Sequence, residues 1–163
     1  MAEKIDFSTV RFLVIDKNPL SAELVRDILV MLGTQIIRIA RTTDRALQVL
    51  RSEEIDVVIT EFQTEPENGV AFVDRLRNGI DSPDRQIPII MLTANSAPMN
   101  VARARDAGVS EFLTKPFNVE GLYRRLVSVI ARPRSYVNSE GYFGPDRRRR
   151  QVPYEGPDRR SSS

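Results

Sequence analysis

With 163 residues, of which 41% are apolar, the chain is long enough for one domain with its own core and an additional segment. It contains neither cysteine nor histidine, which excludes disulfides, a thiol nucleophile, zinc–thiolate sites and the usual general base. No apolar run is long enough to cross a bilayer and the start lacks an apolar signal core, so we expect a cytoplasmic protein with no membrane insertion. Residues 132–163 carry a net charge of +4 and residues 1–131 carry −2, which predicts a basic tail with an anionic partner.

Strand and helix patterns alternate five times along the first part of the chain. Short apolar runs rich in β-branched residues predict strands over residues 10–15, 36–40, 56–61, 87–93 and 111–114. Apolar residues at helical spacing predict helices over residues 20–32, 43–50, 70–76, 101–107 and 119–130. This alternation predicts an α/β fold with a parallel sheet covered by helices on both faces, and the continuous apolar run at 56–61 predicts its central strand.

The alternation stops at residues 132–134, where proline stands between two arginines. Proline ends a helix because it lacks the amide donor and clashes with the preceding turn. We therefore predict a folded domain over residues 1–131 and a separate tail over residues 132–163. The tail is dominated by Pro, Gly, Arg and Ser without apolar periodicity, which predicts a flexible segment.

Polar side chains fall at the carboxyl ends of four predicted strands, at Asp16, Glu61, Thr93 and Lys115. In a parallel α/β sheet these ends meet at one edge, where ligands and chemistry gather. The surrounding sequence, over about residues 8–131, resembles the receiver domain of two-component signalling. The blocks that carry the resemblance are residues 12–16, 58–61, 88–94 and 115–117. It implies one doubly wound, flavodoxin-like or CheY-like sheet of five parallel strands in the order 2-1-3-4-5.

The resemblance also implies roles for individual residues. In that family the third strand ends in an aspartate that accepts a phosphoryl group, and an acidic pair after the first strand holds magnesium. Thr93 and Lys115 stand where the family contacts the phosphoryl oxygens. Lys115-Pro116 stands at the family's cis peptide, and Phe112 at its switch aromatic, although a core aromatic is the plainer interpretation of that residue.

Two positions depart from the family. Glu61 stands at the acceptor position, and Asp16-Lys17 replaces the acidic pair. Magnesium prefers several hard oxygen ligands in octahedral order, and phosphoryl transfer requires in-line placement, so we predict neither phosphorylation nor bound magnesium. Glu61 either mimics a phosphorylated aspartate or pairs with Lys115 in a polar cluster, and the pair is the simpler interpretation. Lys17 is expected to be a solvated loop residue.

A seven-residue sequence occurs twice in the tail, at residues 142–148 and 154–160, with six identical positions. In a flexible segment no packing demand would produce this copy, so the repeat predicts a function. A basic tail that binds polyanions loosely explains the arginine run at 147–150, where Arg149 and Arg150 add only charge. It does not explain the paired Tyr, Gly-Pro and Asp.

Each residue type of the repeat suits a guanine nucleotide. Arginine binds guanine edges or phosphates, aspartate accepts hydrogen bonds from guanine donors, tyrosine stacks on bases, and Gly-Pro fixes a turn. Two copies suit a ligand with two guanines and two phosphates, such as cyclic di-GMP. The predicted ligand-binding residues are Tyr142, Asp146, Arg147, Arg148, Tyr154, Asp158, Arg159 and Arg160.

The tail also resembles the arginine-rich extension of Cle proteins, which are CheY-like regulators that bind cyclic di-GMP. This resemblance implies that the ligand orders the tail and that the protein acts on the flagellar motor or on attachment machinery. The leading hypothesis is a non-enzymatic adaptor with a degenerate receiver. The alternatives are a phosphorelay receiver, a receiver with a DNA- or RNA-binding basic arm, and an interaction module whose tail is a docking peptide.

Overall fold

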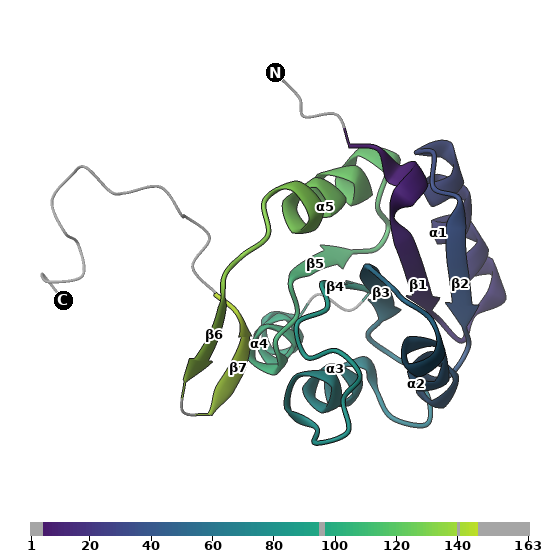
Figure 1. Cartoon of the computed structure of the whole chain (residues 1–163). Coiled ribbons are helices and arrows are strands. Elements are labelled where there is room, and N and C mark those ends of the chain that lie inside the picture. Colours follow the sequence, from purple (N-terminus) through teal and green to yellow (C-terminus); the bar gives the residue numbers. More distant parts are fainter. Residues whose placement is uncertain (1–4, 95–96, 140, 147–163) are drawn as a thin grey trace, which may run out of the picture.

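The computed structural model describes residues 5–94, 97–139 and 141–146. Five parallel strands form one sheet in the order β2-β1-β3-β4-β5, which confirms the predicted topology (Figure 1). The strands are β1 (Arg11–Ile15), β2 (Ile36–Ala40), β3 (Val57–Glu61), β4 (Ile89–Thr93) and β5 (Glu111–Thr114).

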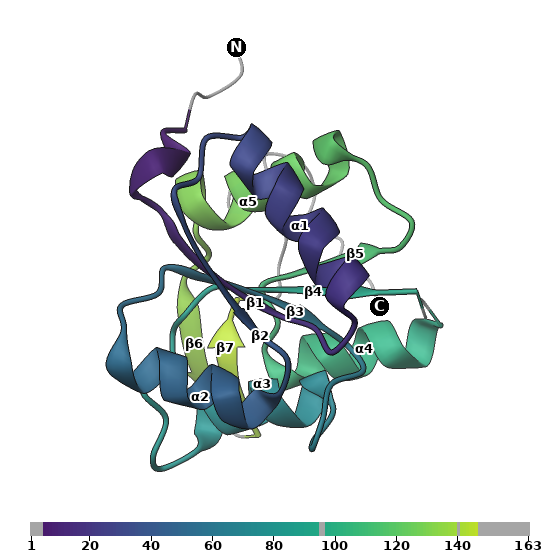
Figure 2. The ribbon, with the colours of Figure 1, turned by 90° about the vertical axis from the view of Figure 1, so that its right-hand side faces the viewer.

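Helices cover both faces of this sheet. α1 and α5 lie on one face, and α2, α3 and α4 lie on the other (Figure 2). Their bounds are α1 (Pro19–Met31), α2 (Thr43–Ser52), α3 (Gly69–Asn78), α4 (Pro98–Ala107) and α5 (Val119–Ala131), and a 3-10 turn, η1 (Phe7–Thr9), precedes β1. Within the described ranges no helix is long and apolar enough to cross a membrane.

The helix ends differ from their predicted positions where a capping residue sets the start. α3 begins at Gly69 because the side chain of Asn68 accepts a hydrogen bond from the Ala71 amide at 2.8 Å. α4 begins at Pro98, three residues before the first periodic apolar residue, because proline fits the first helical position. Apolar spacing marks the buried middle of a helix, whereas its start is set by the capping side chain in α3 and by the proline in α4.

β3 occupies the centre of the sheet, as its sequence predicted. Val58 packs into the cluster under α2, α3 and α4, and Ile59 packs into the cluster under α1 and α5, and both are fully buried. Burial on both faces requires apolar side chains at every position, which explains the continuous apolar run. Glu61 therefore sits at the carboxyl end of the central strand.

A hairpin follows α5 and was not predicted. β6 (Tyr136–Ser139) and β7 (Tyr142–Pro145) pair in antiparallel fashion, and β7 packs against α3 and α4 (Figure 1). The expectation of a tail without regular structure is therefore wrong for residues 136–139 and 142–145. Gly141, with φ of +78°, supplies the left-handed turn conformation between the strands. Each strand has only four residues, which is too short for a clear apolar periodicity in the sequence.

Candidate functional site

Three charged side chains converge at the carboxyl edge of the sheet. The ammonium of Lys115 lies 2.6 Å from Glu61 Oε2 and 3.6 Å from Asp16 Oδ2. The side chains of Lys115, Glu61 and Asp16 are 23%, 13% and 6% exposed, so the cluster is largely shielded from water. Shielding strengthens the attraction and raises the cost of removing any one partner.

Ser21 joins this cluster from α1. Lys115 Nζ donates a hydrogen bond to Ser21 Oγ at 2.6 Å. Asp16 Oδ1 accepts from the Asn18 amide at 2.9 Å, and Asn18 in turn caps α1 by accepting from the Leu20 amide at 2.9 Å. The start of α1 is thus tied to the charged cluster. Sequence reasoning missed Ser21, although its position in the first turn after the cap places it beside the strand ends.

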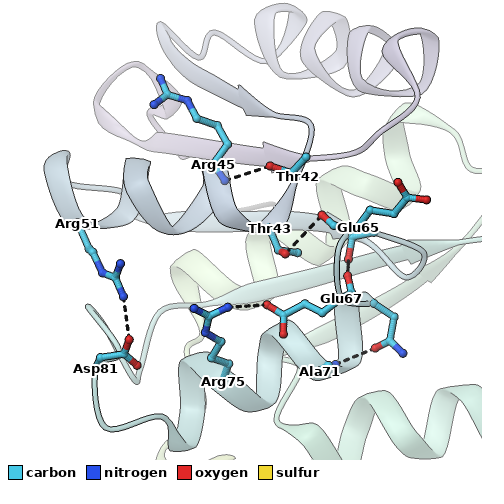
Figure 3. A network of polar contacts seen from close by, with 11 residues as sticks. Thr42, Thr43, Arg45, Arg51, Glu65, Glu67, Ala71, Arg75 and Asp81 are labelled. Atoms are coloured by element: carbon cyan, nitrogen blue, oxygen red, sulfur yellow. Dashed lines mark hydrogen bonds and ion pairs between the residues drawn. The ribbon is translucent and has the colours of Figure 1, made fainter.

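Lys17 pairs with a loop residue outside the cluster, as expected of a solvated loop residue. Its ammonium lies 3.3 Å from Glu65 Oε1, and both side chains are well exposed. Glu65 belongs to the loop that follows β3, and its carbonyl accepts a hydrogen bond from the Thr43 amide at 2.9 Å. Glu67 in the same loop pairs with Arg75 of α3 at 2.9 Å (Figure 3). The loop after Glu61 is therefore held by both α2 and α3.

Thr93 and Phe112 occupy the positions that the sequence assigned to them. Thr93 ends β4, is 2% exposed, and its carbonyl accepts a hydrogen bond from the Lys115 amide at 2.8 Å. Phe112 is half-buried and packs against the core cluster under α2, α3 and α4, as a core aromatic would. The Lys115-Pro116 peptide is cis, as the resemblance implied.

The response regulator receiver domain family matches residues 12–127. This chain belongs to the receiver domain family. Among curated relatives, the heme response regulator HssR of Staphylococcus aureus is 32% identical over 101 residues, which cover 62% of this chain. That stretch is 43% of HssR, so the receiver spans less than half of the length of such relatives.

Solved structures share the receiver fold. The chemotaxis response regulator CheY4 of Vibrio cholerae is 26% identical, with a TM-score of 0.67 over 74% of this chain and 98% of its own. A putative response regulator from Chloroflexus aurantiacus is 26% identical, with a TM-score of 0.69 over 76% of this chain and 100% of its own. The receiver domain of the sensor histidine kinase PA1611 from Pseudomonas aeruginosa was solved with a magnesium ion in its active-site cleft. It is 23% identical, with a TM-score of 0.66 over 75% of this chain and 98% of its own. At this identity it supports the fold alone.

The family implies a magnesium ion beside the acceptor, and the residues of this receiver do not fit one. Asp16 and Glu61 supply only two carboxylates at this edge, and both are paired with Lys115. Lys17 stands where a second acidic residue would have to supply an oxygen. In the described part of the chain, no group of three acidic, histidine or cysteine side chains could hold a metal ion.

The hairpin covers a buried arginine of the receiver body. Arg77 of α3 is fully buried, and its Nε and Nη1 donate to the carbonyls of Gly108 at 3.0 Å and Arg85 at 2.9 Å. Its guanidinium lies 5.1 Å from the ring centroid of Tyr136, and that of Arg85 lies 4.1 Å from the ring centroid of Phe143. Two aromatic rings of the hairpin thus cap two cations of the body, a favourable arrangement for both.

Packing against the receiver body explains the Tyr-x-Gly-Pro residues of the first repeat copy. A Cβ at Gly144 would lie 2.7 Å from the Tyr142 hydroxyl, closer than real Cβ atoms approach, and 3.0 Å from the Cα of Gly108, so glycine lets the hairpin pack closely against the end of α4. Tyr142 is 9% exposed, and its hydroxyl donates to the carbonyl of Pro145 at 2.7 Å. The inference that no packing demand shaped the repeat is therefore wrong for the first copy.

Two of the eight predicted ligand residues lie in this docked segment. Tyr142 and Asp146 are 9% and 7% exposed, and the Asp146 amide donates to the carbonyl of Ser135 at 2.6 Å. Arg134, which sequence reasoning missed, donates to Glu111 Oε2 at 3.1 Å and to the Asp146 carbonyl at 3.4 Å. The other six, Arg147, Arg148, Tyr154, Asp158, Arg159 and Arg160, lie outside the described residues.

The stability of the docked hairpin should depend on pH through the ionisation of the Tyr136 phenol. Burial raises the pKa of Tyr136 and outweighs the charge of Arg77, which lowers it. A phenol whose pKa is raised by docking stabilises the docked form below about pH 10, and this contribution is lost as the pH rises through the raised value. An absorbance titration of tyrosinate should show a late-ionising tyrosine that disappears in Tyr136→Phe. Ionisation of all tyrosines together near pH 10 would contradict this.

Proposed function

We propose that this receiver is a non-enzymatic signalling adaptor whose C-terminal tail captures cyclic di-GMP. Capture controls the contact between the receiver body and a protein partner, such as the flagellar motor or attachment machinery. The observation that carries the proposal is the twofold Tyr-x-Gly-Pro-Asp-Arg-Arg sequence, directly after a receiver whose acceptor is Glu61. A receiver that takes its signal through the tail does not need phosphoryl chemistry in the body.

The charged cluster supports a body without phosphoryl transfer. The carboxylate of Glu61 contacts Lys115 at 2.6 Å, and Lys115 also contacts Ser21 at 2.6 Å, so the lysine that the family directs at a phosphoryl group is engaged here. A nucleophilic carboxylate needs a metal to neutralise the incoming phosphoryl charge. In this chain Lys17 replaces one acidic ligand of that metal, and the Glu61–Lys115 contact remains as an ion pair.

The composition of the repeat supports a ligand with two guanines. In our proposal the arginines of both copies bind guanine edges or phosphates, the aspartates accept from guanine donors, and the tyrosines stack on the bases. The residues are those predicted above, with Arg149 and Arg150 contributing only charge. Ordering a peptide on a ligand costs several kcal/mol, so many contacts have to form together. Two copies of one motif meet that requirement on a ligand of twofold symmetry.

Isothermal titration calorimetry of the full chain tests this proposal. We expect micromolar or tighter binding of cyclic di-GMP, and much weaker binding of cyclic di-AMP, which lacks the guanine donors and acceptors. Binding should change little between low and moderate salt. Equal affinity for both dinucleotides, or an affinity for RNA that falls steeply with salt, would support the alternative of a basic nucleic-acid-binding arm.

The chain should not be phosphorylated by acetyl phosphate with magnesium. Glu61 reaches one methylene too far for in-line transfer, and Lys17 removes an oxygen ligand of the metal. Intact-mass spectrometry should therefore show no phosphoryl adduct. The double variant Lys17→Asp with Glu61→Asp restores the acidic pair and the acceptor, and serves as the positive control. A stable adduct on Glu61 of the unaltered chain would support the phosphorelay alternative.

A further inference from the structure

The docked hairpin holds part of the first repeat where it cannot serve a ligand. The ring of Tyr142 is packed beside Gly144 and its hydroxyl is bonded to Pro145, so neither ring face can receive a base. Asp146 is 7% exposed, and its backbone is bonded on both sides, by the amide to Ser135 and by the carbonyl to Arg134. A tail that uses these two residues to bind a nucleotide has to leave the body first.

We propose that the β6–β7 hairpin is a latch, docked on α3 and α4 when no ligand is bound and released when the first repeat copy binds cyclic di-GMP. This inference rests on the function proposed above and adds the regulation of that site. Docking and ligand binding are mutually exclusive because both use Tyr142 and Asp146. The ligand therefore shifts the equilibrium between two forms of the tail by binding one of them alone.

The contacts that hold the latch are suited to reversible docking. A two-stranded hairpin is marginal in water without support, so the hairpin depends on its contacts with the body. These are the two aromatic–guanidinium contacts, the close approach of Gly144 to Gly108, and the ion pair of Arg134 with Glu111. Each of these contacts adds only a modest free energy to docking, so the binding free energy of a ligand that makes many contacts can exceed their sum.

Release would change the surface of the receiver body. Arg77 is buried under Tyr136, and its Nη2 has no hydrogen-bond partner among the described residues. Arg85 loses the ring of Phe143, so both cations become available on the α3–α4 side for an acidic partner. Arg134 also lines the groove between α4 and β5, where it pairs with Glu111. Release of the hairpin would break this ion pair and leave the Glu111 carboxylate in the groove without it. Ligand capture in the tail is thereby linked to a partner surface on the body.

The latch lowers the apparent affinity for the ligand, and this gives a direct test. When a binding-competent form is only partly populated, the apparent dissociation constant rises in proportion. A substitution that weakens docking and leaves the ligand residues intact should therefore tighten binding. Arg85→Ala meets this condition because the Arg85 guanidinium caps Phe143, which is not one of the predicted ligand residues. Its Nε also donates to the carbonyl of Arg77 at 2.7 Å, a contact within the body.

Calorimetry with cyclic di-GMP should show about two- to fivefold tighter binding by Arg85→Ala than by the unaltered chain, the fold-change of one lost aromatic–guanidinium contact. Arg124→Ala is the matched control. It removes one positive charge and one ion pair, with Glu120, on the opposite face of the sheet, and should leave the affinity unchanged. Thermal melts of both variants establish that the body is folded.

Amide hydrogen exchange provides a second readout. Cyclic di-GMP should accelerate exchange across β6 and β7 of the unaltered chain, because release exposes their amides. If all three chains bind the ligand equally and exchange in the hairpin slows or stays constant, the latch is overturned while the proposed function stands. If none of them binds cyclic di-GMP, both proposals fail.

Discussion

Replacing Arg147 and Arg159 together with alanine should weaken the binding of cyclic di-GMP by at least about a hundredfold. These arginines occupy the same position in the two repeat copies. Hydrogen bonds to charged groups contribute about 1.5–3 kcal/mol each, so the loss of one arginine from each copy costs about 3–6 kcal/mol of binding free energy. Calorimetry on the double variant and on the unaltered chain measures the loss directly.

The matched control is the pair Arg149→Ala and Arg150→Ala. It removes the same charge from the same part of the chain, but both residues lie outside the repeat. We expect an affinity within about threefold of the unaltered chain, because diffuse charge is screened at physiological salt. Equal losses in the two double variants would mean that charge alone drives binding. The repeat would then have no role in recognising guanine, and the proposed function would fail.

Replacing Lys115 with methionine should lower the free energy of unfolding by about 3 kcal/mol. Methionine keeps the apolar stem of lysine and removes the ammonium that separates Glu61 from Asp16. Two shielded carboxylates then face each other without a counter-charge, and breaking a buried pair in this way costs about 3–5 kcal/mol. We place the expected loss at the low end because the Lys115 side chain is 23% exposed. Urea denaturation at neutral pH measures it.

Two further variants separate the ion pair from a simple loss of packing. Lys17→Met removes an ammonium whose partner, Glu65, is exposed, and should cost less than about 1 kcal/mol. The double variant Lys115→Met with Glu61→Gln removes both members of the closest pair and should recover part of the stability lost in Lys115→Met. If Lys115→Met is as stable as Lys17→Met, the cluster does not contribute to the fold in the way we infer.

The charged cluster around Lys115 is a fixed part of the receiver, whereas the β6–β7 hairpin is the part that we propose to move. Lys115 is held between Glu61, Asp16 and Ser21, so the sheet edge where receivers accept their signal is engaged in internal contacts. The hairpin is held by arginines capped with aromatic rings, which are contacts of a kind that a ligand can replace. The part of this chain that is suited to change is the segment after α5.

The alternation of strands and helices was predictable because periodicity is a local property of the chain. β3 requires apolar residues on both faces, and α5 requires them on one, so each pattern is visible without its neighbours. The placement of Glu61 and Lys115 at strand ends followed from the same patterns, since parallel strands meet at their carboxyl ends. The repeat and the departures at Lys17 and Glu61 were also visible in the sequence alone.

What the sequence could not decide depends on contacts between distant segments. Arg77 stands in an amphipathic helix where a charged residue is normally solvated, and only the packed hairpin explains its burial. Ser21 is one of several polar residues near the start of α1 until Lys115, far along the chain, is placed beside it. The hairpin itself has too few residues for a periodic signal and is stabilised by the surface that it covers. Local patterns determined the body of this receiver, whereas the docking of residues 142–146 depends on contacts that form only when the elements are packed together.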